Sequence, residues 1–337
     1  MKRKILFIAV AALMALCVPV GCGETDGGLK KVRISEVAHT FFYAPMYIAD
    51  KKGFFEEEGL KVTIENANGA DKVMTALTSK SAEIGLMGPE AAIYVNRAGI
   101  KDAPVIFAQL TQRDGSFLVG RTAQPDFKWS DLTDKHVLAG RPGGVPAMTL
   151  QYICNVSYNL FHNENINLDT SVPFANMGPV FAADASIDYT TLFEPAASQL
   201  VAEGKGFIVA SVGAESGEVP YTAFSANRSY VNANPDTIGA FIRAIVKGYN
   251  YMNEAPRREV AEVLERSFAG TPLSLIEAGL DSYLAIDAWT NSPIMKRAAF
   301  DRLQDIMINA GELEQKVDFD EIVDNSYAQS VLDALSA

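Results

Sequence analysis

Strand and helix signals alternate through the first two thirds of the chain, and this alternation restricts the fold more than any other feature. The β-rich segments of the first series lie at 32–37, 60–64, 82–86 and 105–109, with helical spacing of apolar residues at 44–52, 71–79 and 89–97 between them. A helix between two strands carries the chain back over the sheet, so such strands run in parallel. This order predicts a mainly parallel sheet with helices on both faces.

A second series of the same kind begins at residue 117. Its strand segments are 117–120, 136–139, 170–173, 187–190 and 206–210, and its helical segments are 147–159, 179–183 and 194–203. From Asn234 onward the pattern predicts helices only, over 235–253, 257–268, 273–284 and 293–310. A chain of 337 residues is long enough for two lobes that each bury a core. We therefore expect an α/β protein with two such units.

Residues 1–21 have the composition of an export signal. Basic residues at positions 2–4 precede the apolar run Ile5–Val20, which is shorter than the about twenty residues of a membrane-spanning helix. Gly21 and Cys22 follow, and this order resembles a bacterial lipoprotein signal, in which the cysteine becomes the lipidated N-terminus. We expect a signal peptide over 1–21, lipidation at Cys22 and a flexible tether over 22–30. The alternatives are an ordinary signal peptide and an uncleaved anchor.

The charge and the cysteines narrow the function further. Removal of residues 1–21 takes away three positive charges and no acid, which changes the formal charge from −12 to −15. An acidic chain repels phosphate backbones, so we expect no nucleic acid partner. Only Cys154 would remain in the body, within an amphipathic helical pattern, where we expect a small buried side chain. No internal disulfide is expected.

The sequence contains no arrangement that indicates catalysis. Its three histidines are His39, His136 and His162, and no HExxH, GxSxG or phosphate-loop pattern is present. No Cys/His cluster has the spacing of metal ligands. We therefore expect a protein that is not an enzyme and that holds no cofactor and no metal.

The loop that follows the first strand, Ala38–Asp50, carries aromatic residues at 41–43 and leads into a helix. Open α/β sheets bind ligands at the carboxyl ends of their strands, so this loop is a candidate site. The segment Tyr43–Val95 resembles the N-terminal lobe of periplasmic solute-binding proteins. It is most similar to the group that serves importers of sulfonates, taurine, nitrate and thiamine-pyrimidine precursors.

Short motifs in a fixed order carry this resemblance over most of residues 31–310. They are GFF at 53–55, EGLKV at 58–62, SAEIGLMG at 81–88, GGVP at 143–146, ID at 187–188, FEP at 193–195 and VPYTAF at 219–224. The resemblance implies a two-lobed periplasmic binding protein fold of type II, with the C-terminal helices packed on the first lobe. It also implies a monomeric clamp that closes over one small ligand and presents it to the membrane permease of an ABC importer.

The same resemblance divides the chain and places its binding residues. Lobe 1 would cover 31–115, lobe 2 would cover 116–222, and 223–337 would return to lobe 1. The expected ligand contacts are His39, Thr40, Phe42, Tyr43, Gly88, Pro89, Glu90, Arg113, Gly143, Gly144, Val145, Asp188 and Glu194. Each of them could instead cap a helix or close a turn. Asp114 and Gly115 are expected to form a turn at the crossover between the lobes rather than a contact.

Two classes of ligand remain open. A sulfonate or nitrate needs basic side chains or helix N-termini, for which Arg113, Arg141 and the amides of 143–145 are candidates. A pyrimidine needs ring faces and carboxylates that accept from its amines. The candidates for that class are Phe42, Tyr43, Tyr189, Glu90, Asp188 and Glu194. The aromatic and acidic residues favour a neutral or cationic heteroaromatic ligand, and a sensor that works without a permease is a further alternative.

Overall fold

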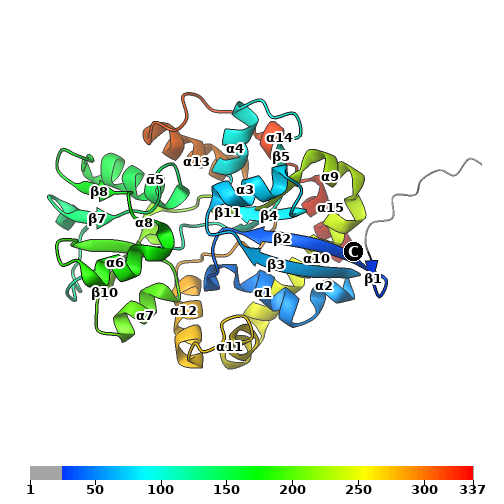
Figure 1. Ribbon diagram of the computed structural model, residues 1–337, viewed down its shortest axis with the longest axis horizontal. Helices are drawn as coiled ribbons and strands as arrows, with labels where there is room; N and C mark the ends of the chain where they lie inside the picture. Colours follow the sequence, from blue (N-terminus) through cyan, green and yellow to red (C-terminus); the bar gives the residue numbers. More distant parts are fainter. Residues whose placement is uncertain (1–24, 337) are drawn as a thin grey trace, which may run out of the picture.

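The computed structural model describes residues 25–336, and the expected signal peptide and Cys22 lie outside them. Two lobes lie side by side along the longest axis, each built on one sheet with helices around it (Figure 1). The two-lobed α/β fold predicted from the sequence is confirmed. Within the described part of the chain, no helix is long and apolar enough to cross a membrane.

Lobe 1 contains a six-stranded sheet. Its main order is β3-β2-β4-β11-β5, and the short β1 pairs with the beginning of β2. The strands are β1 (Thr25–Asp26), β2 (Leu29–Glu36), β3 (Leu60–Asn66), β4 (Ile84–Met87), β5 (Pro104–Thr111) and β11 (Thr222–Asn227). The helices that follow β2, β3 and β4 are α1 (Ala44–Lys51), α2 (Phe54–Glu57), α3 (Ala70–Thr78) and α4 (Glu90–Arg97), with a short helix η1 (Phe41–Tyr43) before α1.

Lobe 2 contains a five-stranded sheet in the order β10-β6-β9-β7-β8. Its strands are β6 (Phe117–Gly120), β7 (His136–Leu138), β8 (Asn167–Asp169), β9 (Tyr189–Leu192) and β10 (Phe207–Ser211). Its helices are η2 (Trp129–Leu132), α5 (Val145–Tyr152) with the π-turn η3 (Ile153–Ser157), η4 (Phe174–Asn176), α6 (Met177–Ala183), α7 (Ala196–Ala202) and α8 (Val212–Ser216). The expected strand at 170–173 lies three residues earlier, as β8.

Both sheets are mixed, because one long strand in each runs against the others, which share the expected parallel direction. β11 pairs antiparallel with β4 and β5, and β6 pairs antiparallel with β9 and β10. The remaining long strands of each sheet share one direction, because β2 pairs parallel with β3 and β4, and β7 with β8 and β9. The two reversed strands, β6 and β11, are those that the chain enters just after it crosses between the lobes.

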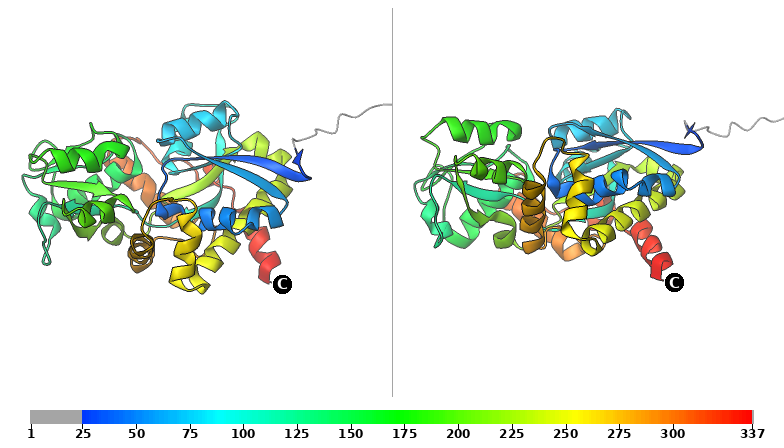
Figure 2. Two further views of the ribbon diagram at one scale, coloured as in Figure 1. Left: turned by 60° about the horizontal axis from the view of Figure 1, so that its bottom comes forward. Right: turned by 90° about the horizontal axis from the view of Figure 1, so that it is seen from below.

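The C-terminal helices cover lobe 1 and also bridge the lobes. They are α9 (Arg228–Ala233), α10 (Pro235–Glu254), α11 (Arg257–Glu265), α12 (Leu273–Ala285), α13 (Arg297–Asn309), α14 (Phe319–Ile322) and α15 (Ser326–Ser336). As predicted, α10 packs on α1 of lobe 1. However, α12 contacts α7 and η1, and α13 contacts α5 and α4, so these two helices touch both lobes (Figure 2).

The core and the surface agree with the composition. Cys154 is buried within lobe 2, and burial raises the pKa of its thiol to about 12, as expected for a packing residue.

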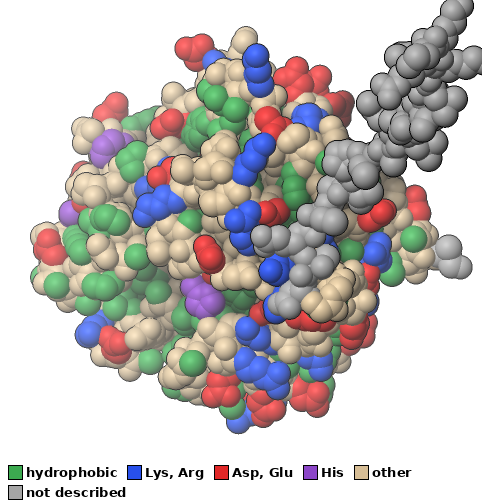
Figure 3. Space-filling view, turned by 45° about the vertical axis from the view of Figure 1, so that its right-hand side comes forward, with side chains coloured by type: hydrophobic (Ala, Val, Ile, Leu, Met, Phe, Trp, Pro, Cys, Tyr) green, Lys and Arg blue, Asp and Glu red, His purple; other side chains and the backbone are tan. Residues whose placement is uncertain are grey.

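C-terminal segments cover the edge of β5. The N–H of Asp324 donates to the carbonyl oxygen of Ile106, and the N–H of Thr290 donates to the carbonyl oxygen of Leu110. On the face in Figure 3, acidic and basic side chains of the described residues are interspersed.

Candidate functional site

Both sheets present the same kind of edge to the other lobe. In lobe 1, the carboxyl end of β2 leads into the loop at 37–40 and that of β4 leads into Gly88. In lobe 2, the carboxyl end of β7 leads into the glycine loop at 139–144 and that of β9 leads into Phe193. Because β6 and β11 run the opposite way, their preceding residues lie at these edges as well, with Phe117 opposite Leu192 and Ala223 opposite Met87. The candidate site lies where these edges meet.

Hydrogen bonds join the lobes directly at this interface. The Thr40 hydroxyl and the Phe41 N–H both donate to the carbonyl oxygen of Glu194, at 2.6 and 3.2 Å. The Glu194 N–H donates to the Tyr283 hydroxyl at 2.9 Å. The Glu194 carboxylate accepts from the N–H and hydroxyl of Ser198, so it pairs with the first turn of α7. Thr40 and Glu194, both expected as ligand contacts, therefore lie together at the interface, where their hydrogen bonds are with the protein itself.

Aromatic rings from both lobes pack beside these hydrogen bonds. The Phe42 ring lies 5.4 Å from that of Phe193, 5.7 Å from Tyr221 and 5.1 Å from Tyr283, measured between centroids. Gly115, in the crossover, is packed closely between Phe42 and Phe193. A Cβ atom at this position would lie 2.8 Å from the Phe42 ring and 2.7 Å from the Phe193 ring. Pairs of this geometry contribute about 0.5–1.5 kcal/mol each beyond the area that they bury. Phe42 is thus central to the interface, and its expected contact with a ligand stays a prediction.

Glu90 is the most unusual polar residue of the interface. It begins α4, it is 2% exposed, and its Oε2 has no hydrogen-bond partner among the described residues. Burial raises the pKa of its carboxyl to about 7, although Arg141 and the backbone N–H groups of Glu90, Ala91 and Val145 act in the opposite direction. The Arg141 guanidinium lies 3.8 Å from Oε1. Arg141 and Val145 belong to lobe 2, so Glu90 joins the lobes electrostatically.

Asp114 and Tyr221 form a second buried polar pair. The Asp114 Oδ1 accepts from the N–H and hydroxyl of Ser116, which confirms the expected turn at the crossover. Its Oδ2 and the Tyr221 hydroxyl have no hydrogen-bond partner with good geometry in the described chain. Burial raises the pKa of Asp114 to about 7, and the Tyr221 hydroxyl opposes this rise. The negative charges of Asp114 and Glu90 both raise the pKa of Tyr221, so the three groups share one neighbourhood.

Tyr43 completes this neighbourhood. Its side chain is buried, and burial followed by the charges of Glu36 and Glu90 raises the pKa of its hydroxyl far above the usual range. The hydroxyl of Tyr43 therefore remains protonated at any physiological pH. Together Tyr43, Glu90, Asp114 and Tyr221 combine ring faces with carboxyl oxygens, and two of these oxygens make no well-formed hydrogen bond to any described residue.

The glycine-rich segments, which were expected to let backbone approach a ligand, are approached closely by side chains of the protein itself. A Cβ at Gly88 would lie 1.9 Å from the Glu90 Oε2, so glycine lets this carboxyl fold back over the strand end. Gly143 has a φ of +65°, and its carbonyl accepts from the Tyr94 hydroxyl of lobe 1 at 3.1 Å. Pro89 and Gly144 are the N-caps of α4 and α5, and Val145 is the first residue of α5.

Arg113 lies next to Asp114 in the crossover, and its buried Nε has no hydrogen-bond partner in the described structure.

Three other candidates, His39, Asp188 and Tyr189, make their contacts away from the interface. His39 is half-exposed, stacks on Phe268 and interacts with Glu36 and the Ser267 carbonyl, at 3.0 and 2.8 Å. Asp188 precedes β9, at the end opposite Phe193. It accepts from the His136 N–H and pairs with Lys135.

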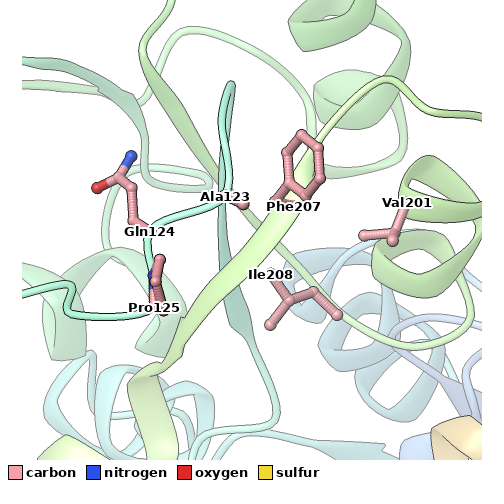
Figure 4. A pocket seen from close by; sticks show the side chains of 6 residues that line it. All are labelled: Ala123, Gln124, Pro125, Val201, Phe207 and Ile208. Carbon is pink, nitrogen blue, oxygen red and sulfur yellow. The ribbon is translucent and has the colours of Figure 1, made fainter.

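Tyr189 points into lobe 2, where its hydroxyl donates to Gln124. A crevice of about 400 Å³ lies nearby, between the loop at 123–125 and the edge strand β10 with Val201 of α7 (Figure 4). Its lining is largely apolar and it is open to solvent. Among the described residues there is no group of three or more His, Cys, Asp or Glu side chains that could hold a metal ion.

Comparison with known proteins now places the chain in a family. The family profile described as NMT1/THI5 like matches residues 40–259. The chain belongs to the NMT1/THI5-like family. The Bacillus subtilis (strain 168) protein named "Putative binding protein YtlA" is 37% identical to this NMT1/THI5-like chain over 325 residues, which is 96% of each chain.

Two solved structures share the fold of this NMT1/THI5-like chain. The alkanesulfonate-binding protein SsuA from Xanthomonas axonopodis pv. citri superposes with a TM-score of 0.70 and 17% identity, over 88% of this chain and 98% of that one. The periplasmic nitrate-binding protein NrtA from Synechocystis PCC 6803 gives 0.69 and 17%, over 91% and 89%. The periplasmic binding protein fold expected from the sequence is therefore confirmed. All three relatives bear the names of binding proteins rather than of enzymes.

Proposed function

We propose that this protein is the substrate-binding component of an ABC importer, not an enzyme, and that it captures a small organic solute between its lobes. Family membership, the fold and the names of the relatives support this function. The signal-like residues 1–21 and Cys22 favour an exported protein with a lipid anchor at the outer face of the membrane or in the periplasm. Lobes that cover 31–115 and 116–222 would then close about the crossover, and a monomer would deliver the ligand to a permease.

Two buried carboxyl groups at the interface favour a ligand that donates hydrogen bonds. Glu90 and Asp114 are buried at the interface, and within the described part of the chain each keeps one carboxyl oxygen without a hydrogen bond of good geometry. A buried acceptor of this kind costs about 1–3 kcal/mol unless a donor reaches it. A heteroaromatic ring with an exocyclic amine, as in a thiamine pyrimidine precursor, offers N–H donors to these oxygens and a face to Phe42 and Tyr43. Sulfonate and nitrate offer acceptors only.

The anion alternative has one observation in its favour, the unpartnered Nε of Arg113. Calorimetry with the wild-type protein separates the two classes, using an aminopyrimidine precursor, ethanesulfonate and nitrate as titrants. We expect micromolar or tighter binding of the aminopyrimidine, which corresponds to about 8 kcal/mol or more. Binding of an anion alone would overturn the proposed ligand class.

Two variants test the contacts. Glu90→Gln keeps the size of the side chain and removes its charge, so it should weaken aminopyrimidine binding about 10-fold to 100-fold, the value of a charge-assisted hydrogen bond. Asp188→Asn is the matched control, because Asp188 is an acid at the far end of β9, and it should leave the affinity unchanged. X-ray scattering should show compaction when the ligand binds, and an unchanged radius would count against closure of the lobes.

A further inference from the structure

Two helices begin at the interface from opposite lobes and point their N-termini at one place. α4 follows β4 in lobe 1 and has Pro89 as its N-cap, and α5 follows the glycine loop of lobe 2 and has Gly144 as its N-cap. Neither N-cap residue makes a side-chain capping hydrogen bond. Unpaired N–H groups and the helix dipole make such N-termini favourable positions for an anion.

The carboxyl group of Glu90 occupies this position. It is almost fully buried, it interacts with the first N–H groups of α4 and with the Val145 N–H of α5, and Arg141 of lobe 2 lies 3.8 Å from its Oε1. The missing Cβ of Gly88 provides the space in which the carboxyl folds back. Above its pKa of about 7, Glu90 therefore supplies the protein's own anion to a place that combines two helix N-termini and a guanidinium.

We propose that Glu90 determines the charge selectivity of the proposed ligand site, because its carboxylate fills an anion site that the two helices and Arg141 would otherwise offer to a solute. This proposal rests on the proposed function in placing the ligand site at the interface. The filled site repels sulfonate, nitrate and carboxylate groups, and it leaves the buried Oε2, which has no hydrogen-bond partner among the described residues, as an acceptor for a neutral or cationic ligand. The negative charge of Asp114 nearby adds to the repulsion.

The experiment removes the internal anion and supplies it from solution. Glu90→Ala deletes a fragment the size of acetate, and formate, acetate and nitrate are planar anions that fit the vacated space. Thermal unfolding is followed in each sodium salt and in sodium chloride at equal ionic strength. We expect a saturable rise in the melting temperature of Glu90→Ala with formate, acetate or nitrate, and no such rise for the wild-type protein.

Two further variants control for general salt effects and for space. Asp188→Ala removes an acid that is partly exposed and lies away from these helices, so it should show no saturable rise. Glu90→Gln removes the charge but fills the space, so it should show none either. Equal responses of Glu90→Ala and Asp188→Ala, or an equal response of the wild-type protein, would overturn the proposal. If Glu90→Ala folds only when one of these anions is present, that recovery supports the proposal.

If Glu90→Ala fails to fold in every salt, Glu90→Ser takes its place, with the same expected result and the same result that would overturn the proposal. Failure of both variants to fold in every salt also overturns the proposal.

The result of this salt experiment is separable from the test of the proposed function. A wild-type protein that binds no aminopyrimidine would refute the proposed ligand, yet rescue of Glu90→Ala by small anions would stand, since it depends only on the helix N-termini, Arg141 and the vacated space.

Discussion

Replacement of Gly115 by alanine should force the two lobes apart. Its backbone φ lies outside the left-handed region, so alanine fits the chain itself, and the effect arises from the added Cβ alone. That atom would lie 2.8 Å from the Phe42 ring and 2.7 Å from the Phe193 ring, well inside van der Waals contact. The rings cannot turn aside freely, because Tyr221 and Tyr283 pack against Phe42.

The size of the effect follows from overpacking, which costs about 1–3 kcal/mol in a well-packed core. Phe42 belongs to lobe 1 and Phe193 to lobe 2, so separation of the lobes relieves the strain. A penalty of about 2 kcal/mol on the closed arrangement alone would shift the equilibrium between closed and open forms about 30-fold toward the open form. The Kd for the ligand should rise by up to the same factor.

Calorimetry gives the Kd, and X-ray scattering gives the radius of gyration with and without ligand. Gly178→Ala in α6 is the control, since its Cβ would meet Leu192 at an ordinary distance of 3.7 Å, and it should be neutral or stabilising by up to about 1 kcal/mol. A Gly115→Ala protein that melts at a lower temperature but keeps the wild-type Kd and radii would refute the reasoning. The strain would then be absorbed within one lobe.

Three further results are expected. Thr40→Val keeps the shape of the side chain but removes the donor to the Glu194 carbonyl, so it should weaken ligand binding by about 1 kcal/mol, or about fivefold, in calorimetry. Burial raises the pKa values of Glu90 and Asp114 to about 7, so the folded protein binds more protons than the unfolded chain between about pH 4.5 and 7. The free energy of unfolding, measured by denaturant titration, should therefore fall as the pH rises from about 4.5 through 7, and Glu90→Gln should flatten this dependence. A free energy of unfolding that rises over this range would contradict the prediction. In a protein produced from residue 24 onward, the thiol of Cys154 should react with a disulfide reagent only after unfolding, because it is buried and its pKa is about 12.

The regular elements of the fold were predictable because their signals are local. Apolar spacing predicted α1, α4 and α10 to within one or two residues, and alternation predicted β3. The strand β11 was not predicted, since its residues TAFSAN are buried throughout and show no alternation. The contacts of α12 and α13 with both lobes were also beyond prediction, because they depend on how distant helices pack.

The candidate site was predicted in part, and the failures share one cause. Sequence reasoning looked for residues after strands, and the structure places Thr40, Glu90 and the segment at 143–145 at the interface between the lobes. Asp114 and Tyr221 precede strands instead, and they reach the same edge only because β6 and β11 run in reverse. Asp188 was expected at the site, yet it lies before β9, at the edge of the sheet that faces away from lobe 1.

The reversed strands also connect ligand capture with closure. Asp114 and Tyr221 flank the two places where the chain crosses between the lobes, and Glu90 is contacted across the interface by Arg141 and Val145. When the lobes meet without a ligand, the Glu90 Oε2, which has no partner among the described residues, costs about 1–3 kcal/mol. Asp114 and Tyr221 interact with each other only with poor hydrogen-bond geometry, so they add to this cost and further disfavour the closed form. A ligand that donates to these oxygens removes that cost only after closure has buried them. The same three groups would therefore recognise the ligand and make closure depend on its presence.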